Sequence, residues 1–88
     1  MRERSGHVIS SAIVTVKPGW RDAVTAALAG SPGTEVRAAE GSKLVVLLEG
    51  ASRGEVGGRL AAIALMDGVV SANMVFEHVE EEDGEVRA

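Results

Sequence analysis

The two histidines of the chain, His7 and His78, carry the side chains best suited to bind a metal or to exchange a proton near neutral pH. Each lies at the outer end of a segment rich in β-branched residues. If these segments are antiparallel neighbours in one sheet, the two imidazoles come close together. A metal site needs a third or fourth ligand, and the sequence places no carboxylate evidently beside the two histidines to supply one. We therefore expect a structural pair with a mild pH response if the rings touch, and no metal.

The serines and glycines form no catalytic pattern. Ser10 and Ser11 lie in an apolar segment with no base positioned to activate them. The G-x-x-G-G run at 54–58 falls inside a predicted helix, which argues against a dinucleotide-binding loop. Residues 17–21 match an anion-binding loop only weakly, and the chain has no cysteine for thiol chemistry. The sequence therefore predicts a protein that is not an enzyme and has no cofactor of its own.

The composition is that of one small acidic domain. The chain has 88 residues, of which 45% are hydrophobic, and a formal net charge of −4. Binding to nucleic acid uses clustered Lys and Arg and stacking aromatic residues, so the acidic balance and the lack of Tyr argue against it. The apolar run at 8–16 is too short to span a membrane or to act as a signal peptide. Together with the absence of cysteine, this predicts a cytoplasmic protein.

The hydrophobic patterns predict the element order β-α-β-β-α-β. Trp20, Val24 and Leu28 recur at helical spacing in the first helix, and Ser52 with Glu55 matches a capping box at the start of the second. The predicted strands cover about 7–16, 34–39, 43–49 and 69–78, and the predicted helices cover about 19–29 and 53–66.

Right-handed crossovers turn this order into a ferredoxin-like split βαβ sandwich of the α+β class. Its antiparallel four-stranded sheet has the strand order 4-1-3-2, with both helices on one face. Residues 7–79 are predicted to form this single domain. Residues 1–6 and the acidic tail at 80–88 are predicted to be disordered.

The first strand is apolar or small on both of its faces. Residues 7–16 read His-Val-Ile-Ser-Ser-Ala-Ile-Val-Thr-Val, whereas a strand with one wet face should alternate apolar and polar residues. The predicted helices cover only one face of the sheet. The other face should therefore be apolar and uncovered, and we expect it to contact a partner chain or a ligand.

We assign the bulkier alternating set of each strand to the face that packs against the helices. This choice places Ile9 and Ile13 in the core, with Ser11 as a small buried exception whose hydroxyl bonds locally. It also places His7 and His78 on the helix side of the sheet. The core positions expected on the other strands are Val36, Ala38, Leu44, Val46, Leu48, Val70, Ala72, Met74 and Phe76.

The opposite face then carries the candidate binding site. A small apolar centre with a polar, mostly acidic rim is typical of a recognition surface. Three alternatives are open for this face: it binds a partner peptide, it pairs with a second copy in a homodimer, or it has no function. The predicted residues are Ser10, Ala12, Val14, Val45, Leu47, Glu49, Ser71, Asn73, Val75 and Glu77, with Glu35 and Arg37 at one edge.

Over residues 7–79 the chain resembles the NapD family, small cytoplasmic chaperones that assist maturation of the catalytic subunit of the periplasmic nitrate reductase. The acidic tail is also similar to the family. At Ser11 and Ala12 larger aliphatic residues are expected in the family, and at Phe76 a tyrosine is common. The resemblance rests on four segments, HVISS at 7–11, SPGTEV at 31–36, KLVVLLE at 43–49 and DGVVSANMVFEH at 67–78.

The resemblance implies a protein that binds the twin-arginine signal peptide of the nitrate reductase subunit. Binding would delay export until the molybdenum cofactor and the iron–sulfur cluster are inserted. The apolar centre of the face would bind the apolar part of the peptide, and Glu35, Glu49, Glu77 and the tail would attract its basic part. The peptide would become ordered on binding, as a helix on the sheet.

Two further functions remain open at this point. One is a regulatory domain that binds a small molecule at a seam between paired sheets, with Gly54–Gly58 as its ligand loop. The other is an assembly subunit that associates with itself through the same sheet face.

Overall fold

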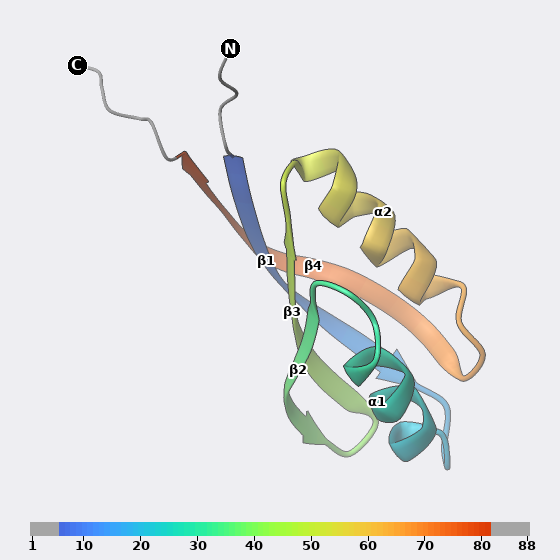
Figure 1. Cartoon of the computed structure of the whole chain (residues 1–88). Helices are drawn as coiled ribbons and strands as arrows, with labels where there is room; N and C mark the ends of the chain where they lie inside the picture. The colour runs from blue at the N-terminus through green and yellow to red at the C-terminus, as the bar shows by residue number, and fades with distance from the viewer. Residues whose placement is uncertain (1–5, 82–88) are drawn as a thin grey trace.

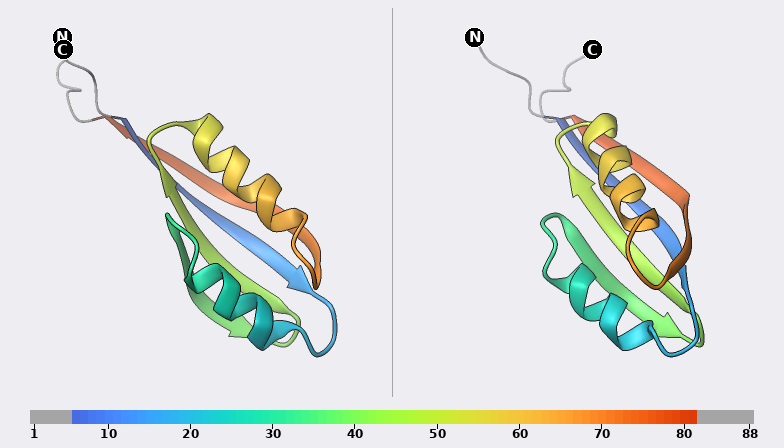
Figure 2. Two further views of the ribbon diagram at one scale, coloured as in Figure 1. Left: turned by 45° about the vertical axis from the view of Figure 1, so that its right-hand side comes forward. Right: turned by 90° about the vertical axis from the view of Figure 1, so that its right-hand side faces the viewer.

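The computed structural model describes residues 6–81, which form a two-layer sandwich of one sheet and two helices (Figure 1). The sheet is antiparallel throughout and has the order β2-β3-β1-β4, which is the predicted order seen from the other edge. Both helices lie on the same face of the sheet (Figure 2). The ferredoxin-like fold is therefore confirmed. The elements are β1 (Gly6–Val16), α1 (Arg21–Ala29), β2 (Thr34–Glu40), β3 (Lys43–Gly50), α2 (Arg53–Ala64) and β4 (Val69–Glu81).

The longest strand, β4, continues beyond its predicted end. It was expected to end at His78, but its backbone stays paired with β1 as far as the pairs His7↔Glu80 and Gly6↔Glu81. Backbone pairing does not depend on side-chain polarity, so the acidic composition of this segment does not end the strand. Residues 80 and 81 thus belong to the sheet rather than to a disordered tail. Gly6, also predicted to be disordered, belongs to β1. The rest of the predicted disordered ends, 1–5 and 82–88, lies outside the described residues.

The start of α2 contains the predicted capping box in a slightly different form. The Ser52 Oγ accepts a hydrogen bond from the Glu55 amide at 3.1 Å, as expected for an N-cap residue. The Glu55 carboxylate reaches back to the amide of Ala51 at 2.8 Å instead of the amide of Ser52. Two amides at the start of α2 are therefore satisfied by side chains.

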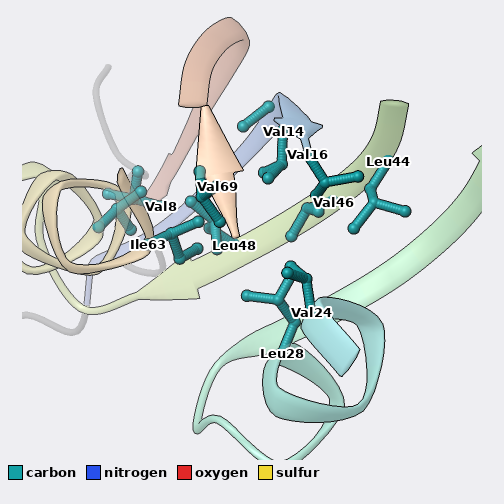
Figure 3. Close-up of a cluster of buried hydrophobic side chains, with 12 residues drawn as sticks. Val8, Val14, Val16, Val24, Leu28, Leu44, Val46, Leu48, Ile63 and Val69 are labelled. Atoms are coloured by element: carbon teal, nitrogen blue, oxygen red, sulfur yellow. The ribbon is translucent and has the colours of Figure 1, made fainter. Parts of the chain in front are cut away.

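The core lies between the sheet and the two helices and is entirely aliphatic (Figure 3). Val24 and Leu28 of α1 and Val56 and Ile63 of α2 pack onto the central strands. No aromatic ring takes part in this cluster of buried residues. The strand residues of the core are Val8, Ala12, Val14, Val16, Leu44, Val46, Leu48 and Val69.

Trp20 has a different role from the one that its helical spacing predicted. It is the N-cap residue of α1 and is 39% exposed, so it does not continue the buried stripe of Val24 and Leu28. Its ring lies against Gly68, where an added Cβ would come within 2.3 Å of the ring. The amide of Lys17 donates to the Gly68 carbonyl at 2.8 Å. Trp20 therefore fastens the loop before α1 to the turn that enters β4.

Candidate functional site

The two faces of β1 are the reverse of the prediction. Ser10, Ala12 and Val14, expected on the open face, are fully buried on the helix side. Their β3 partners are Leu48, Val46 and Leu44, which the sequence correctly placed in the core. Because a strand alternates strictly, these pairings turn every odd-numbered residue of β1 to the open face.

Ile9, Ser11 and Ile13 consequently lie on the open face and not in the core, and each is half-buried. The size of the residues did not indicate which set of β1 is buried, because both sides of the strand are apolar. The helix side accepts the smaller set, since Ser10 and Ala12 allow the helix layer to approach the central strand closely.

The buried Ser10 hydroxyl provides a direct check of this face assignment. Its Oγ has no hydrogen-bond partner among the described residues, so desolvation of the hydroxyl is uncompensated. We expect Ser10→Ala to keep the stability of the protein or to raise it by up to about 1 kcal/mol, measured by urea unfolding. A loss above about 1 kcal/mol would contradict this placement.

Two β-bulges in β4 decide which of its side chains reach the open face. The register shift at Ser11/Ala12 leaves Val75 without a partner, and the shift at Thr15/Val16 leaves Val70 without one. Phe76 therefore pairs with Ser11 on the open face and is 59% exposed, instead of being buried. Val70, also predicted in the core, is exposed at the other bulge.

Glu77 is moved to the opposite side by the same bulge. It pairs with the buried Ser10, and its Oε1 lies 3.2 Å from the Nε of Arg53 on the helix side. Its predicted place on the open face is wrong. Ser71 and Asn73 pair with Thr15 and Ile13 and do lie on the open face, and Val75 is exposed at the bulge.

The edge strand β2 contains a third irregularity. The register with β3 shifts between Val36 and Ala38, so Arg37 is unpaired. Val36 packs against the core as predicted. Ala38 pairs with Val45 and lies on the open face, although it was expected in the core. Alternation of residue types cannot reveal a bulge, which explains the error at Ala38 as well as those in β4.

Strand β3 follows the prediction throughout. Leu44, Val46 and Leu48 are fully buried. Val45, Leu47 and Glu49 lie on the open face. The open face is therefore a real surface whose β3 residues were correctly identified, while its β1 residues are the odd-numbered set.

Three rows of paired residues make up the middle of this open face. Within residues 6–81 neither helix covers it, because both helices lie on the other side (Figure 2). Charged side chains occur at its ends and edges and not at its centre. The rows, each written from β2 or β3 towards β4, are Glu49–Ile9–His78, Glu35–Leu47–Ser11–Phe76 and Ala38–Val45–Ile13–Asn73.

Two shallow hollows lie along the β2–β3 side of the open face. The first, which we name the apolar hollow, has a volume of about 390 Å³ and is lined by Ile13, Ala38, Ala39, Glu40, Ser42, Lys43 and Val45. The second, which we name the acidic hollow, has a volume of about 230 Å³ and is lined by Gly33, Thr34, Glu35, Leu47 and Glu49.

Among residues 6–81, both carboxylates of the acidic hollow make only loose contacts with basic side chains. The Glu49 Oε1 lies 3.6 Å from the Nε2 of His7, and the Glu35 Oε2 lies 3.8 Å from the Nε of Arg37. Ion pairs between such exposed side chains contribute little free energy. A cationic ligand can therefore replace either partner at small cost.

The two histidines lie on the open face and not on the helix side, as the β1 reversal requires. His78 pairs with Ile9, and His7 pairs with Glu80, so the histidines are not directly opposite each other. Across residues 6–81, no three His, Asp or Glu side chains gather as a metal site.

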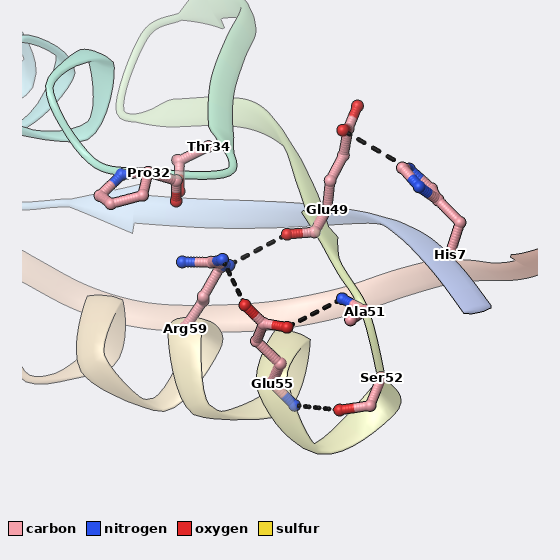
Figure 4. A network of polar contacts seen from close by, with 8 residues as sticks. All are labelled: His7, Pro32, Thr34, Glu49, Ala51, Ser52, Glu55 and Arg59. Carbon is pink, nitrogen blue, oxygen red and sulfur yellow. Dashed lines mark hydrogen bonds and ion pairs between the residues drawn. The ribbon is translucent and has the colours of Figure 1, made fainter. Parts of the chain in front are cut away.

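The backbone of Glu49 is held in place by a network that includes Arg59, a residue that the sequence did not single out (Figure 4). Its amide donates to the Gly33 carbonyl at 2.8 Å, and its own carbonyl accepts from the Arg59 Nε at 3.0 Å. The Arg59 Nη2 also donates to Glu55 at 2.8 Å. This network ties the end of β3 to α2 while the Glu49 side chain extends towards His7. In the sequence, the glycine that precedes β2, Gly33, was the signal that the backbone of another segment comes close at this position.

Neither helix in the described part of the chain is long and apolar enough to cross a bilayer.

Comparisons with known proteins give a consistent result. A family model described as NapD protein matches residues 7–81. The curated "Chaperone NapD" of Paracoccus pantotrophus is 51% identical over 71 residues, which are 81% of this chain but only 63% of that protein's length. The solution structure of the E. coli Tat proofreading chaperone protein NapD has a TM-score of 0.75 at 23% identity, over 93% of this chain and 87% of that one. That structural match supports the fold. From the family match and the curated relative, the chain belongs to the NapD family.

Proposed function

We propose that this protein is a cytoplasmic chaperone that binds the twin-arginine signal peptide of the catalytic subunit of the periplasmic nitrate reductase. Binding delays export of that subunit until its cofactors are inserted. Two relatives support the proposal, because one is described as a chaperone and the other as a Tat proofreading chaperone. The protein itself acts by binding and not by catalysis.

The observation that carries the proposal is the apolar face of the sheet that, within residues 6–81, neither helix covers. Ile9, Ile13, Val45 and Leu47 form an apolar surface on the two central strands, and Phe76 extends it onto β4. An exposed apolar surface of this kind, bordered by polar groups, is characteristic of a protein-binding site. The carboxylates of Glu35 and Glu49 complement the basic part of a twin-arginine peptide.

The two kinds of group make different contributions to binding. Burial of the apolar segment of the peptide supplies the affinity, and it must exceed the entropy lost when a disordered peptide becomes ordered. The carboxylates of the acidic hollow accelerate the encounter and select basic peptides. Since they are exposed, their contribution is screened by salt.

The proposal predicts salt-dependent binding of the cognate peptide. Isothermal titration with the synthetic twin-arginine leader should give a Kd of roughly 1 μM or tighter at low salt. Raising the salt from about 20 mM to about 200 mM should weaken binding by roughly fivefold, because the Debye length shortens. A scrambled peptide of the same composition is the control. If the folded protein fails to bind the leader at low salt, the proposed function is wrong.

Self-association through the same face is the second candidate function, and the exposure of Phe76 and Val45 favours it. Light scattering after size exclusion, with and without the peptide, separates the two candidates. A monomer that binds the peptide supports the chaperone, whereas a dimer that excludes the peptide supports self-association. The small-molecule alternative receives no such support, because Gly54, Gly57 and Gly58 lie within α2 on the other side of the sheet.

A further inference from the structure

We propose that the signal peptide binds in one direction, with its arginines at the acidic hollow and with one bulky apolar side chain, further along the peptide, in the apolar hollow. The size of the apolar hollow is set by Ala38, which therefore determines specificity. This inference rests on the proposed function and specifies how the open face recognises the direction and the apolar side chain of its peptide.

The apolar hollow exists because of the bulge at Arg37. The register shift brings Ala38 opposite Val45 on the open face. Ile13 of β1, the next strand, also lines the hollow. Three apolar side chains on three adjacent strands thus surround the space, and the smallest of them lies at the sheet edge. A methyl group at this position leaves room for an aliphatic or aromatic side chain of the partner.

The acidic hollow lies at the other end of the same seam. Within the described part of the chain, its two carboxylates have only the loose partners His7 and Arg37, at 3.6 and 3.8 Å. A guanidinium binds a carboxylate through two parallel hydrogen bonds, which are shorter and stronger than these pairs. Arginines of the peptide are therefore favoured at Glu35 and Glu49.

The charges at the two ends of the seam disfavour the reversed direction. Lys43 and Glu40 both line the apolar hollow, so the charges at that end balance, whereas the acidic hollow has two carboxylates. A peptide lying the other way would place its arginines beside this balanced pair and its apolar segment beside Glu35 and Glu49. Both changes are unfavourable, the first because the arginines lose the attraction of two carboxylates and the second because those carboxylates lose their solvation.

The spacing between the hollows fits a helical peptide. Glu49 and Val45 lie four residues apart on one face of β3, which is about 13 Å in a strand. A helix rises 1.5 Å per residue, so this distance equals roughly eight or nine residues. The side chain that occupies the apolar hollow should therefore follow the arginines by about two and a half helical turns. In a twin-arginine leader that position lies in the apolar segment, because the basic part comes first.

The first test fills the apolar hollow. Ala38→Leu should weaken binding of the synthetic leader peptide by about tenfold, since the anchoring side chain loses its place. The stability of the variant should not fall, because Ala38 is an exposed edge residue. Ala61→Leu, the same change at an exposed position of α2, is the matched control and should bind as the wild type does. Equal affinities for Ala38→Leu and Ala61→Leu would overturn the role of Ala38.

The second test determines in which direction the bound peptide lies on the open face. A nitroxide label beside the arginines should broaden the amide signals of Gly33 and Glu49 and spare those of Ser42 and Lys43. A label at the far end of the apolar segment should give the opposite pattern. The reverse of either result would overturn the proposed direction while leaving the proposed function intact. Absence of any binding by the wild-type protein would overturn the function itself, so the two failures are distinguishable.

Discussion

Ile13→Asp should leave the protein folded and weaken binding of the twin-arginine peptide by at least about a hundredfold, whereas Val14→Asp should unfold it. The two residues are neighbours on β1, but they point to opposite sides of the sheet. Ile13 is half-buried on the open face between Val45 and Asn73, and Val14 is fully buried against the helices.

The difference in stability follows from solvation. An aspartate at position 13 remains accessible to water and costs about 1–2 kcal/mol through lost packing and strand propensity. An aspartate at position 14 is buried without a partner, at a cost above about 4 kcal/mol, which approaches the whole stability of a small domain. Bound peptide would bury the new charge at position 13, which explains the loss of affinity.

Circular dichroism with thermal unfolding measures the first part of this prediction, and titration calorimetry with the synthetic peptide measures the second. Unfolding of Ile13→Asp together with a folded Val14→Asp would mean that the faces of β1 are the other way round. Full peptide binding by a folded Ile13→Asp would show that the binding site is not on the open face.

Gly33→Ala should destabilise the protein by roughly 3 kcal/mol or more, and Gly41→Ala should cost only about 1 kcal/mol. Both glycines have positive φ angles, 64° at Gly33 and 59° at Gly41, so both alanines carry the same backbone strain. The difference is in their surroundings. An added Cβ at Gly33 would lie 2.6 Å from the carbonyl oxygen of Glu49, whereas an added Cβ at Gly41 has no atom of residues 6–81 within 4 Å.

Relief of that contact at Gly33 requires movement of backbone, because the nearest atom is a main-chain oxygen. The same oxygen accepts from Arg59, and the Glu49 amide donates to Gly33, so the end of β3 would move with it. Urea unfolding of the two variants measures the difference in free energy. Equal losses at the two positions would show that the Gly33 turn yields without disturbing β3.

The element order and topology were predictable because each signal was local and unambiguous. The run Leu44–Leu48 is continuously apolar, which is typical of a central strand, and Ser52 with Glu55 marks the start of α2. The turns before β2, β3 and β4 each contain a glycine with positive φ. These features point to the same fold, and tertiary packing did not override them.

The assignment of faces was less predictable, for two physical reasons. Strand β1 is apolar on both sides, so alternation alone cannot say which set meets the helices. The bulges at Arg37, Val70 and Val75 then reverse the alternation within single strands, which is why Ala38 and Phe76 are on the open face. The prediction of an uncovered apolar face is independent of this error, because either set of β1 residues leaves one.

The most direct test of the peptide-binding face is solution NMR of the complex with the twin-arginine leader, observing nuclear Overhauser effects between peptide protons and methyl groups of the protein. We expect effects to Ile9, Ile13, Val45 and Leu47, and none to Ala61 or Leu65, which are exposed on the helix layer. Effects confined to Ala61 and Leu65 would contradict peptide binding by the open face, since the peptide would then lie on the helices.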